Sequence, residues 1–252
     1  MLFRSTARFE EAARIGKVLD LHADLFGKNT WQKAEVAIAV NEMNYQFFKT
    51  MINGNDHLVY SMRGWHHLLW EEGIPVDFVN ITTPEEAGIT SYKAIILPFP
   101  YALSEEIANQ LSSYVENGGN LICEAAPGRL SHHGTANRGE LSPCMRSLFG
   151  VEQENFANIR EPVETGRWTP QERTWGEFYD SCWLEGAGLL NGYRTRANVI
   201  LQTFRCKGSE PCLTVGGAIA GVYRQVGNGF VWLLGTCLGH SGTAYRDENT
   251  SI

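Results

Sequence analysis

The stretch from Ser91 to Glu124 constrains the fold of this chain more than any other, because it contains a complete strand, helix and strand. The apolar run Ala94–Pro98 has the length and continuity of a strand that is covered on both faces. A helical pattern follows it, and the pair Gly118–Gly119 then precedes a second apolar run, Leu121–Cys123. Two buried strands joined through a helix form a right-handed crossover, which is the unit of a parallel sheet.

The helix within this stretch has a signal at its start and a single apolar face. Ser104 is the expected N-cap, and Glu105 and Glu106 fall in the first turn, where the helix dipole favours negative charge. Apolar residues recur at helical spacing, namely Ile107, Ala108, Leu111, Tyr114 and Val115. We therefore expect this face of the helix to lie on the sheet.

The chain before Ser91 shows the same alternation of strands and helices. Strands are expected at Glu35–Val40 and Val76–Val79, and the helix between them, Leu58–Glu72, carries one apolar stripe that ends at a glycine. A longer amphipathic helix, Thr6–Phe26, precedes the first strand. This alternation is typical of an open parallel sheet with helices on both faces.

The second half of the chain is less regular. A short helix is expected at Cys144–Phe149, the segment Asn155–Gly188 has no clear period, and late strands are expected at Asn198–Phe204 and Gly229–Leu234. The sequence Val226–Gly229 between apolar runs is a hairpin signal. The sequence therefore predicts an α/β fold: a flavodoxin-like, doubly wound, mainly parallel sheet with a C-terminal β-hairpin.

Charge and hydropathy exclude two classes of partner. The 252 residues carry a net charge of −7, and they contain no basic stripe of the kind that binds nucleic acid or acidic membranes. No run of 18 apolar residues is present, so we expect no membrane-spanning helix. The first thirty residues lack the apolar segment of a signal peptide, and we expect a cytoplasmic protein.

The six cysteines are scattered and contain no CxxC pair, so no structural zinc site is expected. Buried free thiols are the main interpretation, and a bridge between Cys206 and Cys212 is the alternative. The adjacent histidines His66 and His67 would point about 100° apart on a helix and would not chelate one ion well, whereas His132 and His133 lie in a polar loop. We expect neither a metal nor a cofactor.

Several segments together resemble a known family. In order along the chain they read AEVAIAVNE, LLWEEGIPVDFVN, YKAIILPFPYALSEEIANQLSSYVENGGNLICEAAPG, SPCMRSLFGVE and VGNGFVWLLGT. This order resembles the trimerisation (middle) domain of family 42 glycoside hydrolases, the bacterial β-galactosidases, over about residues 7 to 240. The resemblance implies a class I glutamine-amidotransferase-like fold that is not itself catalytic, packs subunits into a trimer and helps to wall the neighbour's sugar-binding cleft.

The resemblance also implies a division of the chain. Residues 1–30 would be the N-terminal linking helix, residues 31–240 the amidotransferase-like trimerisation domain, and residues 241–252 a tail. The sequence departs from the family pattern in an extended stretch between Asn41 and Asp56 and in a Trp-rich insertion around Trp168 to Trp183.

Three residues are weak candidates for catalysis. Cys123 holds the position of an amidotransferase nucleophile, but it lies inside an apparent strand and the following residues do not open a helix, which favours a core thiol. Glu42 follows Asn41 at a strand end, as the acid in many barrel glycosidases does, and Glu124 is the only other strand-end carboxylate. For Glu42 a catalytic role, a helix-cap or loop role, and a contact to a sugar or a neighbouring subunit all remain open.

The loops at the strand ends supply the candidate contact residues. We expect the loops Asn41–Tyr45, Phe99–Tyr101 and Gly128–Asn137 to face the sugar cleft. The candidate residues for a carbohydrate or interface contact are Asn41, Tyr45, Trp65, Phe99, Tyr101, Arg129, His132 and His133. Core packing for Trp65 and simple solvation for the two histidines are the competing interpretations.

The sequence therefore predicts a non-catalytic accessory domain of a β-galactosidase-like glycoside hydrolase. Its expected partners are further copies of itself in a homotrimer and a galactoside bound through the parent enzyme, with no nucleic acid and no membrane. Two alternatives remain: a free-standing amidotransferase-like or small-molecule hydrolase that uses Cys123, and a stand-alone sugar-binding protein.

Overall fold

A computed structural model of the chain describes residues 7–27, 33–51, 57–83, 88–137, 141–158 and 183–240. The chain divides into two units, Met1–Lys33 and Ala34–Ile252. The expected tail, residues 241–252, and most of the Trp-rich segment, residues 159–182, lie outside the described residues.

The described residues of the first unit form two helices where one helix was expected. Helix α1 (Ala7–Leu21) is followed by the short helix α2 (Ala23–Gly27). The break falls at His22, whose N–H still donates to the Val18 carbonyl while its own carbonyl accepts from the Leu25 N–H. Within this unit α1 buries none of its residues, and apolar side chains such as Leu21 are exposed.

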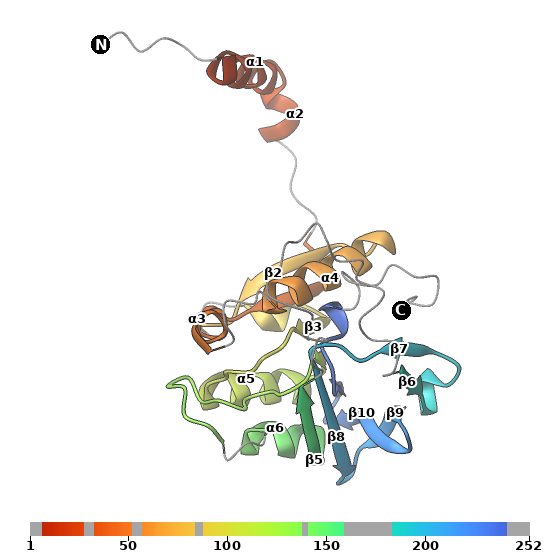
Figure 1. Ribbon diagram of the computed structural model, residues 1–252. Helices are drawn as coiled ribbons and strands as arrows, with labels where there is room; N and C mark the ends of the chain where they lie inside the picture. The colour runs from red at the N-terminus through yellow and green to blue at the C-terminus, as the bar shows by residue number, and fades with distance from the viewer. Residues whose placement is uncertain are drawn as a thin grey trace, which may run out of the picture. The chain divides into compact units, whose positions relative to one another are not determined.

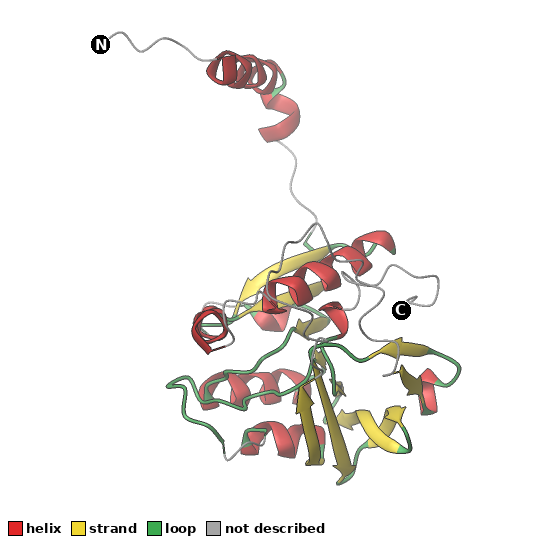
Figure 2. Ribbon diagram, viewed as in Figure 1, coloured by secondary structure: helices red, strands yellow, loops and turns green. Residues whose placement is uncertain are grey.

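The second unit is a mixed sheet with helices on both faces (Figures 1 and 2). Its helices are α3 (Glu42–Met51), α4 (His57–Glu71), α5 (Glu105–Glu116) and α6 (Pro143–Phe149), with short 3-10 turns η1 (Ile89–Ser91) and η2 (Gly188–Leu190). Its strands are β1 (Val36–Val40), β2 (Val76–Asn80), β3 (Ala94–Leu97), β4 (Asn120–Cys123), β5 (Val151–Asn158), β6 (Trp183–Gly186), β7 (Arg194–Arg196), β8 (Ile200–Cys206), β9 (Glu210–Val215), β10 (Ala218–Val226) and β11 (Gly229–Leu234).

One half of the sheet is parallel. Its strands follow the order β2-β1-β3-β4-β11, and each neighbouring pair runs in the same direction. The crossover from β3 through α5 to β4 forms as expected: Ser104 is the N-cap and accepts a hydrogen bond from the Ile107 N–H, and the expected apolar face of α5 is buried. The last strand, β11, therefore lies inside the sheet, between β4 and β10.

The other half of the sheet is antiparallel, so the prediction of a mainly parallel sheet is wrong. Strands β10, β9, β6 and β7 continue the order, while β8 pairs with β10 and with β5. The segment between the two expected late strands, for which only the hairpin signal at Val226–Gly229 was noted, forms β9 and β10. Gly216 and Gly217 join these strands with φ of 54° and 86°, and this left-handed backbone is what a two-residue hairpin requires. The predicted hairpin between β10 and β11 is confirmed.

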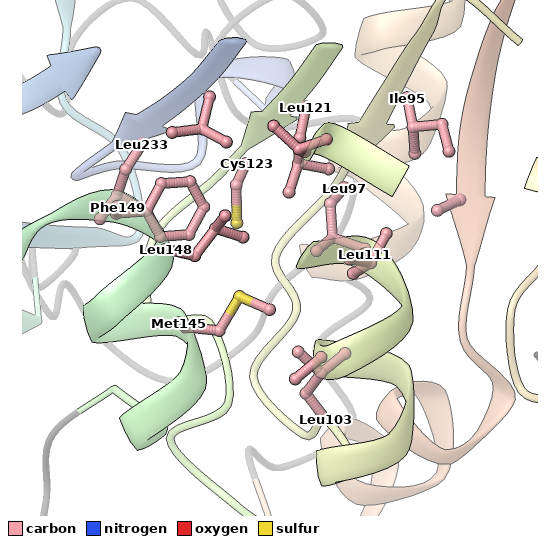
Figure 3. Packing of buried hydrophobic residues seen from close by; sticks show 14 of the residues in the cluster. Ile95, Leu97, Leu103, Leu111, Leu121, Cys123, Met145, Leu148, Phe149 and Leu233 are labelled. Carbon is pink, nitrogen blue, oxygen red and sulfur yellow. The ribbon is translucent and has the colours of Figure 1, made fainter. Parts of the chain in front are cut away.

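Alternation along the parallel strands divides the core between the two faces of the sheet. One set of side chains, including Ile95, Leu97, Leu121 and Leu233, packs against α5 and α6 (Figure 3). The opposite set, including Ile38, Ile96 and Leu234, packs against α4 through Trp65. Because both faces are covered, these strands have continuous apolar sequences and not alternating ones.

Candidate functional site

Polar residues gather where the parallel strands end, and the first of them belong to the start of α3. Asn41 follows β1, and its Oδ1 accepts from the Met43 N–H (3.1 Å) while its Nδ2 donates to the Ala102 carbonyl (3.0 Å). The buried Asn44 continues this contact, because its Nδ2 donates to the Phe99 carbonyl and its Oδ1 accepts from the Ala102 N–H (2.9 Å). The two amides thus hold the loop that follows β3 in one conformation.

Glu124, directly after β4, lies at the centre of a buried hydrogen-bond network. Its Oε1 accepts from Trp65 Nε1 (2.8 Å) and the Gly239 N–H (2.6 Å). Its Oε2 accepts from the Ser61 hydroxyl (2.5 Å) and the Phe99 N–H (3.0 Å). Burial raises the pKa of this carboxyl, and the four hydrogen bonds oppose that rise because they favour the carboxylate. Four donors on two oxygens leave no place for a reacting group.

A second buried polar cluster lies beside the first. The imidazole of His240 is 5% exposed, and its Nδ1 lies 2.8 Å from Asn198 Nδ2 while its Nε2 lies 3.3 Å from His57 Nδ1. Burial, and secondly the nearby imidazole of His57, lower the pKa of His240 to about 3. His240 is therefore neutral at physiological pH. The cluster joins the start of α4, the segment before β8 and the turn after β11.

Among the described residues, three other than glycine have positive φ, and all three belong to one apolar cluster at this end of the sheet: Phe99 (35°), Ala126 (65°) and Val199 (62°). A buried polar side chain holds the backbone at or beside each of them. Glu124 accepts from the Phe99 N–H, Gln202 Oε1 accepts from the Ala126 N–H (2.9 Å), and Thr236 Oγ1 accepts from the N–H of Asn198 (2.6 Å). The strained conformations are thus fixed by the network around them.

Cys123 lies on the other face of the sheet from this network. Its thiol is fully buried in the cluster that α5 and α6 cover, near Phe149 and Met145 (Figure 3). Burial, followed by the charge of Glu124, raises the pKa of this thiol well above its usual value. A nucleophilic cysteine needs the opposite conditions, exposure and a lowered pKa. The structure describes five of the six cysteines, and all five, including Cys206 and Cys212, are free thiols.

The structure places the eleven candidate residues of the sequence analysis at three depths. Exposed are Glu42, Tyr45, His132 and His133. Half-buried are Tyr101 and Arg129. Buried are Asn41, Trp65, Phe99, Cys123 and Glu124. The side chains of the buried group pack or form hydrogen bonds inside the domain and offer no contact surface.

Glu42 and Glu124 differ in exposure and in hydrogen-bond partners. Glu42 is the first residue of α3, its N–H donates to Thr82 Oγ1 (2.9 Å), and its exposed Oε1 accepts from Asn80 Nδ2 (3.0 Å). Glu124 is enclosed and has both oxygens occupied. The second carboxylate of a glycosidase needs access to the sugar, which this position does not give.

Three contacts that involve aromatic or imidazole rings lie near the strand ends, and one of them includes the buried Phe99. The Arg129 guanidinium lies 3.7 Å from the centre of the Phe156 ring, and the rings of Phe99 and Tyr101 lie 5.7 Å apart. His132 and His133, with ring centres 3.6 Å apart, border an open hollow of about 660 Å³. The hollow is lined by Ser104, Glu105, Glu106, Asn109, Ser131, His132 and His133.

Among the described residues, no three His, Cys, Asp or Glu side chains are arranged to hold a metal ion. Within that same part of the chain, no helix combines the length and the apolar character needed to cross a bilayer.

The sequence analysis missed most of the buried polar network. Its members outside the strand ends are Ser61, Asn198, Gln202, Thr236, Gly239 and His240. They are single polar residues or a glycine within apolar or irregular segments, and their partners lie up to 183 positions away in the sequence. Only the polar character of Gln202 and Thr203 within an otherwise apolar strand pattern gave a local signal.

The fold and the filled strand ends describe a mixed α/β domain whose usual ligand position is closed by its own side chains. The chain belongs to the β-galactosidase trimerisation domain family, whose pattern matches residues 34–245.

Similar proteins agree with this assignment. β-Galactosidase GanA of Bacillus subtilis is 25% identical over 168 residues, which are 66% of this chain and 23% of that protein. β-Galactosidase BgaB of Geobacillus sp. is 27% identical over 217 residues, 82% of this chain and 31% of that protein. The solved β-galactosidase of Bacillus circulans sp. alkalophilus shares the fold with a TM-score of 0.72 at 17% identity, over 95% of this chain and 34% of that one. The chain thus spans about a quarter to a third of these three proteins.

Proposed function

We propose that this chain is the oligomerising, non-catalytic accessory domain of a β-galactosidase-like glycoside hydrolase. The match to the trimerisation domain family over residues 34–245 is the observation that carries the proposal. The proposed assembly is a homotrimer, and the proposed substrate of the whole enzyme is a galactoside. Both follow the names of the family and of its relatives.

The chemistry of the strand ends supports a non-catalytic role. In related open sheets, ligands bind at the carboxyl ends of the strands. Here Glu124, Trp65 and Phe99 fill that position with a network in which both carboxylate oxygens are occupied. The buried thiol of Cys123 also argues against the alternative of a free-standing hydrolase or amidotransferase.

The proposal includes the finer description of the fold as flavodoxin-like and class I amidotransferase-like. The order β2-β1-β3-β4-β11 of the parallel strands supports it, because it is the order of a flavodoxin-like sheet. A cytoplasmic location is also proposed, since the five described cysteines are free thiols.

We further propose that the exposed and half-buried strand-end residues form the surface next to the sugar cleft. Tyr45, Tyr101, Arg129, His132 and His133 remain available for this role. A surface that is held by Asn41, Asn44 and Glu124 is preorganised, which lowers the entropy lost when it binds.

The test is the solution mass of the chain by light scattering, together with hydrolysis of a chromogenic β-galactoside. A trimer without hydrolysis is the expected result. A monomer that hydrolyses the substrate would overturn the proposal. A monomer that binds galactosides in calorimetry without hydrolysis would replace it with a stand-alone sugar-binding protein.

A further inference from the structure

Exposed apolar side chains gather at the β2 end of the sheet. On edge strand β2 Phe78 is 53% exposed, and just after α4 Trp70 and Ile74 are 68% and 40% exposed. The ring of His66 stacks on Phe78 with centres 5.6 Å apart, and the ring of His67 lies 6.4 Å from Trp70. We call Trp70, Ile74 and Phe78 the β2 patch.

The core does not require these three side chains. Helix α4 already contributes Leu58 and Trp65 to the interior, and Met62 and Leu69 pack partly against it. Trp70 lies beyond this stripe, at the end of the helix. Large exposed aromatic residues that the fold does not use are typical of protein interaction surfaces.

A second exposed apolar group lies at the other end of the strand order. Leu189 of η2 is 64% exposed and Tyr193, next to β7, is 56% exposed. The guanidinium groups of Arg194 and Arg196 lie 4.5 and 4.6 Å from the ring centre of Trp183 on β6. We call Leu189 and Tyr193 the β7 patch.

The charges around the two patches are complementary. Exposed Glu71 and Glu72 border the β2 patch. Glu71 Oε1 lies 3.0 Å from His67 Nε2, and Arg63 is exposed nearer the start of α4. Arg194 and Arg196 border the β7 patch, where Glu185 is the residue opposite Arg194 in the strand register. Carboxylates next to one apolar patch can thus pair with guanidinium groups next to the other.

We propose that the β2 patch of one copy of this chain binds the β7 patch of the next copy, as the repeated contact of a ring. This inference rests on the proposed function, because it takes a second copy of the chain as the occupant. A ring of three cannot be built from a self-complementary contact; each subunit must present two different surfaces. Patches at opposite ends of the strand order meet that requirement.

The first test disrupts each patch separately in the full chain. Trp70→Glu and Ile74→Asp alter the β2 patch, and Leu189→Asp and Tyr193→Asp alter the β7 patch. Because all four side chains are exposed, each variant is expected to fold with the circular dichroism spectrum of the wild type, and its mass in sedimentation should fall threefold, from trimer to monomer. Phe230→Glu is the control, since Phe230 is 40% exposed but lies on β11, outside both patches.

The second test mixes two monomeric variants. A Trp70→Glu copy keeps an intact β7 patch, and a Leu189→Asp copy keeps an intact β2 patch. Mixing them should form one contact and give a 1:1 dimer, detected by sedimentation with one variant fluorescently labelled.

The outcomes separate the two proposals. If the wild type is a trimer and either patch variant stays a trimer, or if the mixture forms no dimer, the inference fails while the proposed oligomerising function stands. If the wild type is a monomer at all concentrations, the proposed function fails and the inference fails with it.

Discussion

The indole N–H of Trp65 donates a hydrogen bond to Glu124 Oε1 at 2.8 Å, across 59 positions of sequence. This contact connects the middle of α4 to the end of β4 on the face of the sheet that α4 covers. Three further donors meet the same carboxylate, and one of them, the N–H of Gly239, comes from the turn after the last strand. The network therefore joins segments that are distant in the chain, and its removal should affect the whole domain.

Glu124→Gln tests this network. The glutamine amide keeps one acceptor oxygen but replaces the other with an NH₂ group, so two of the four donors lose their acceptor. We expect a loss of about 2–4 kcal/mol in the free energy of unfolding, measured by urea denaturation at neutral pH. Glu42→Gln is the control, because Glu42 is exposed, and it should leave the midpoint unchanged. Equal midpoints for Glu124→Gln and the wild type would mean that the network does not stabilise the fold.

His240 should make the stability depend on pH. Its pKa is lowered to about 3 in the folded state from the usual 6.5, so the unfolded chain binds this proton more readily. The stabilising contribution is complete above pH 6.5 and is lost as the pH falls toward 3, with a slope of up to about 1.4 kcal/mol per pH unit. His240→Gln should have a smaller slope in this range in denaturation series at several pH values.

The comparison isolates His240 because Glu124, whose raised pKa acts in the opposite direction, is present in both proteins. His132→Gln removes an exposed imidazole and serves as the control, with the slope of the wild type. Parallel pH profiles for the wild type and His240→Gln would show that His240 does not cause the pH dependence of the stability.

Cys123 should react slowly with thiol reagents in the native protein. Its thiol is fully buried, and burial raises its pKa, so labelling requires local or global opening of the structure. Cys144 and Cys206 are only half-buried and should be labelled before Cys123, as measured by mass spectrometry of peptides over time. Labelling of Cys123 as fast as that of Cys144 would revive the interpretation of Cys123 as a nucleophile.

Gly239→Ala should destabilise the domain through a close approach of two backbones. A Cβ at this position would lie 2.3 Å from the Ser61 carbonyl oxygen and 2.4 Å from Trp65 Cδ1, so α4 or the turn must shift. We expect a loss of about 1–3 kcal/mol in thermal or urea unfolding. Gly16→Ala is the matched control, because nothing lies within 4 Å of its Cβ position. A destabilisation no larger than that of the control would show that the turn adapts freely.

The sequence carried enough information for the parallel half of the fold. The Ser104 cap and the period from Ile107 to Val115 place α5, and the continuous apolar runs of β1, β3 and β4 indicate strands covered on both faces. These signals are local, and the structure follows them within one or two residues.

The antiparallel half and the buried network could not be predicted in the same way. Gly216 and Gly217 allow a loop as readily as a hairpin, and only the pairing of β9 with β10 decides between them. Trp65 and Phe99 both donate hydrogen bonds to Glu124, which comes from another strand end. Sequence spacing indicates that these residues are near strand ends, but it does not report which side chains meet there.

The position of β11 has a consequence for synthesis on the ribosome. Strand β11 pairs with β4, and its Phe230 lies opposite Asn120 of β4. The pairing of β4 with β11 can therefore form only after nearly the whole domain has emerged. Until then β4 and β10 present open edges to other nascent chains, and such edges promote misassembly. Folding of this domain is therefore expected to be complete only after Gly229–Leu234 has emerged from the ribosome, and a chain that terminates before Gly229 should be a substrate for chaperones and proteases.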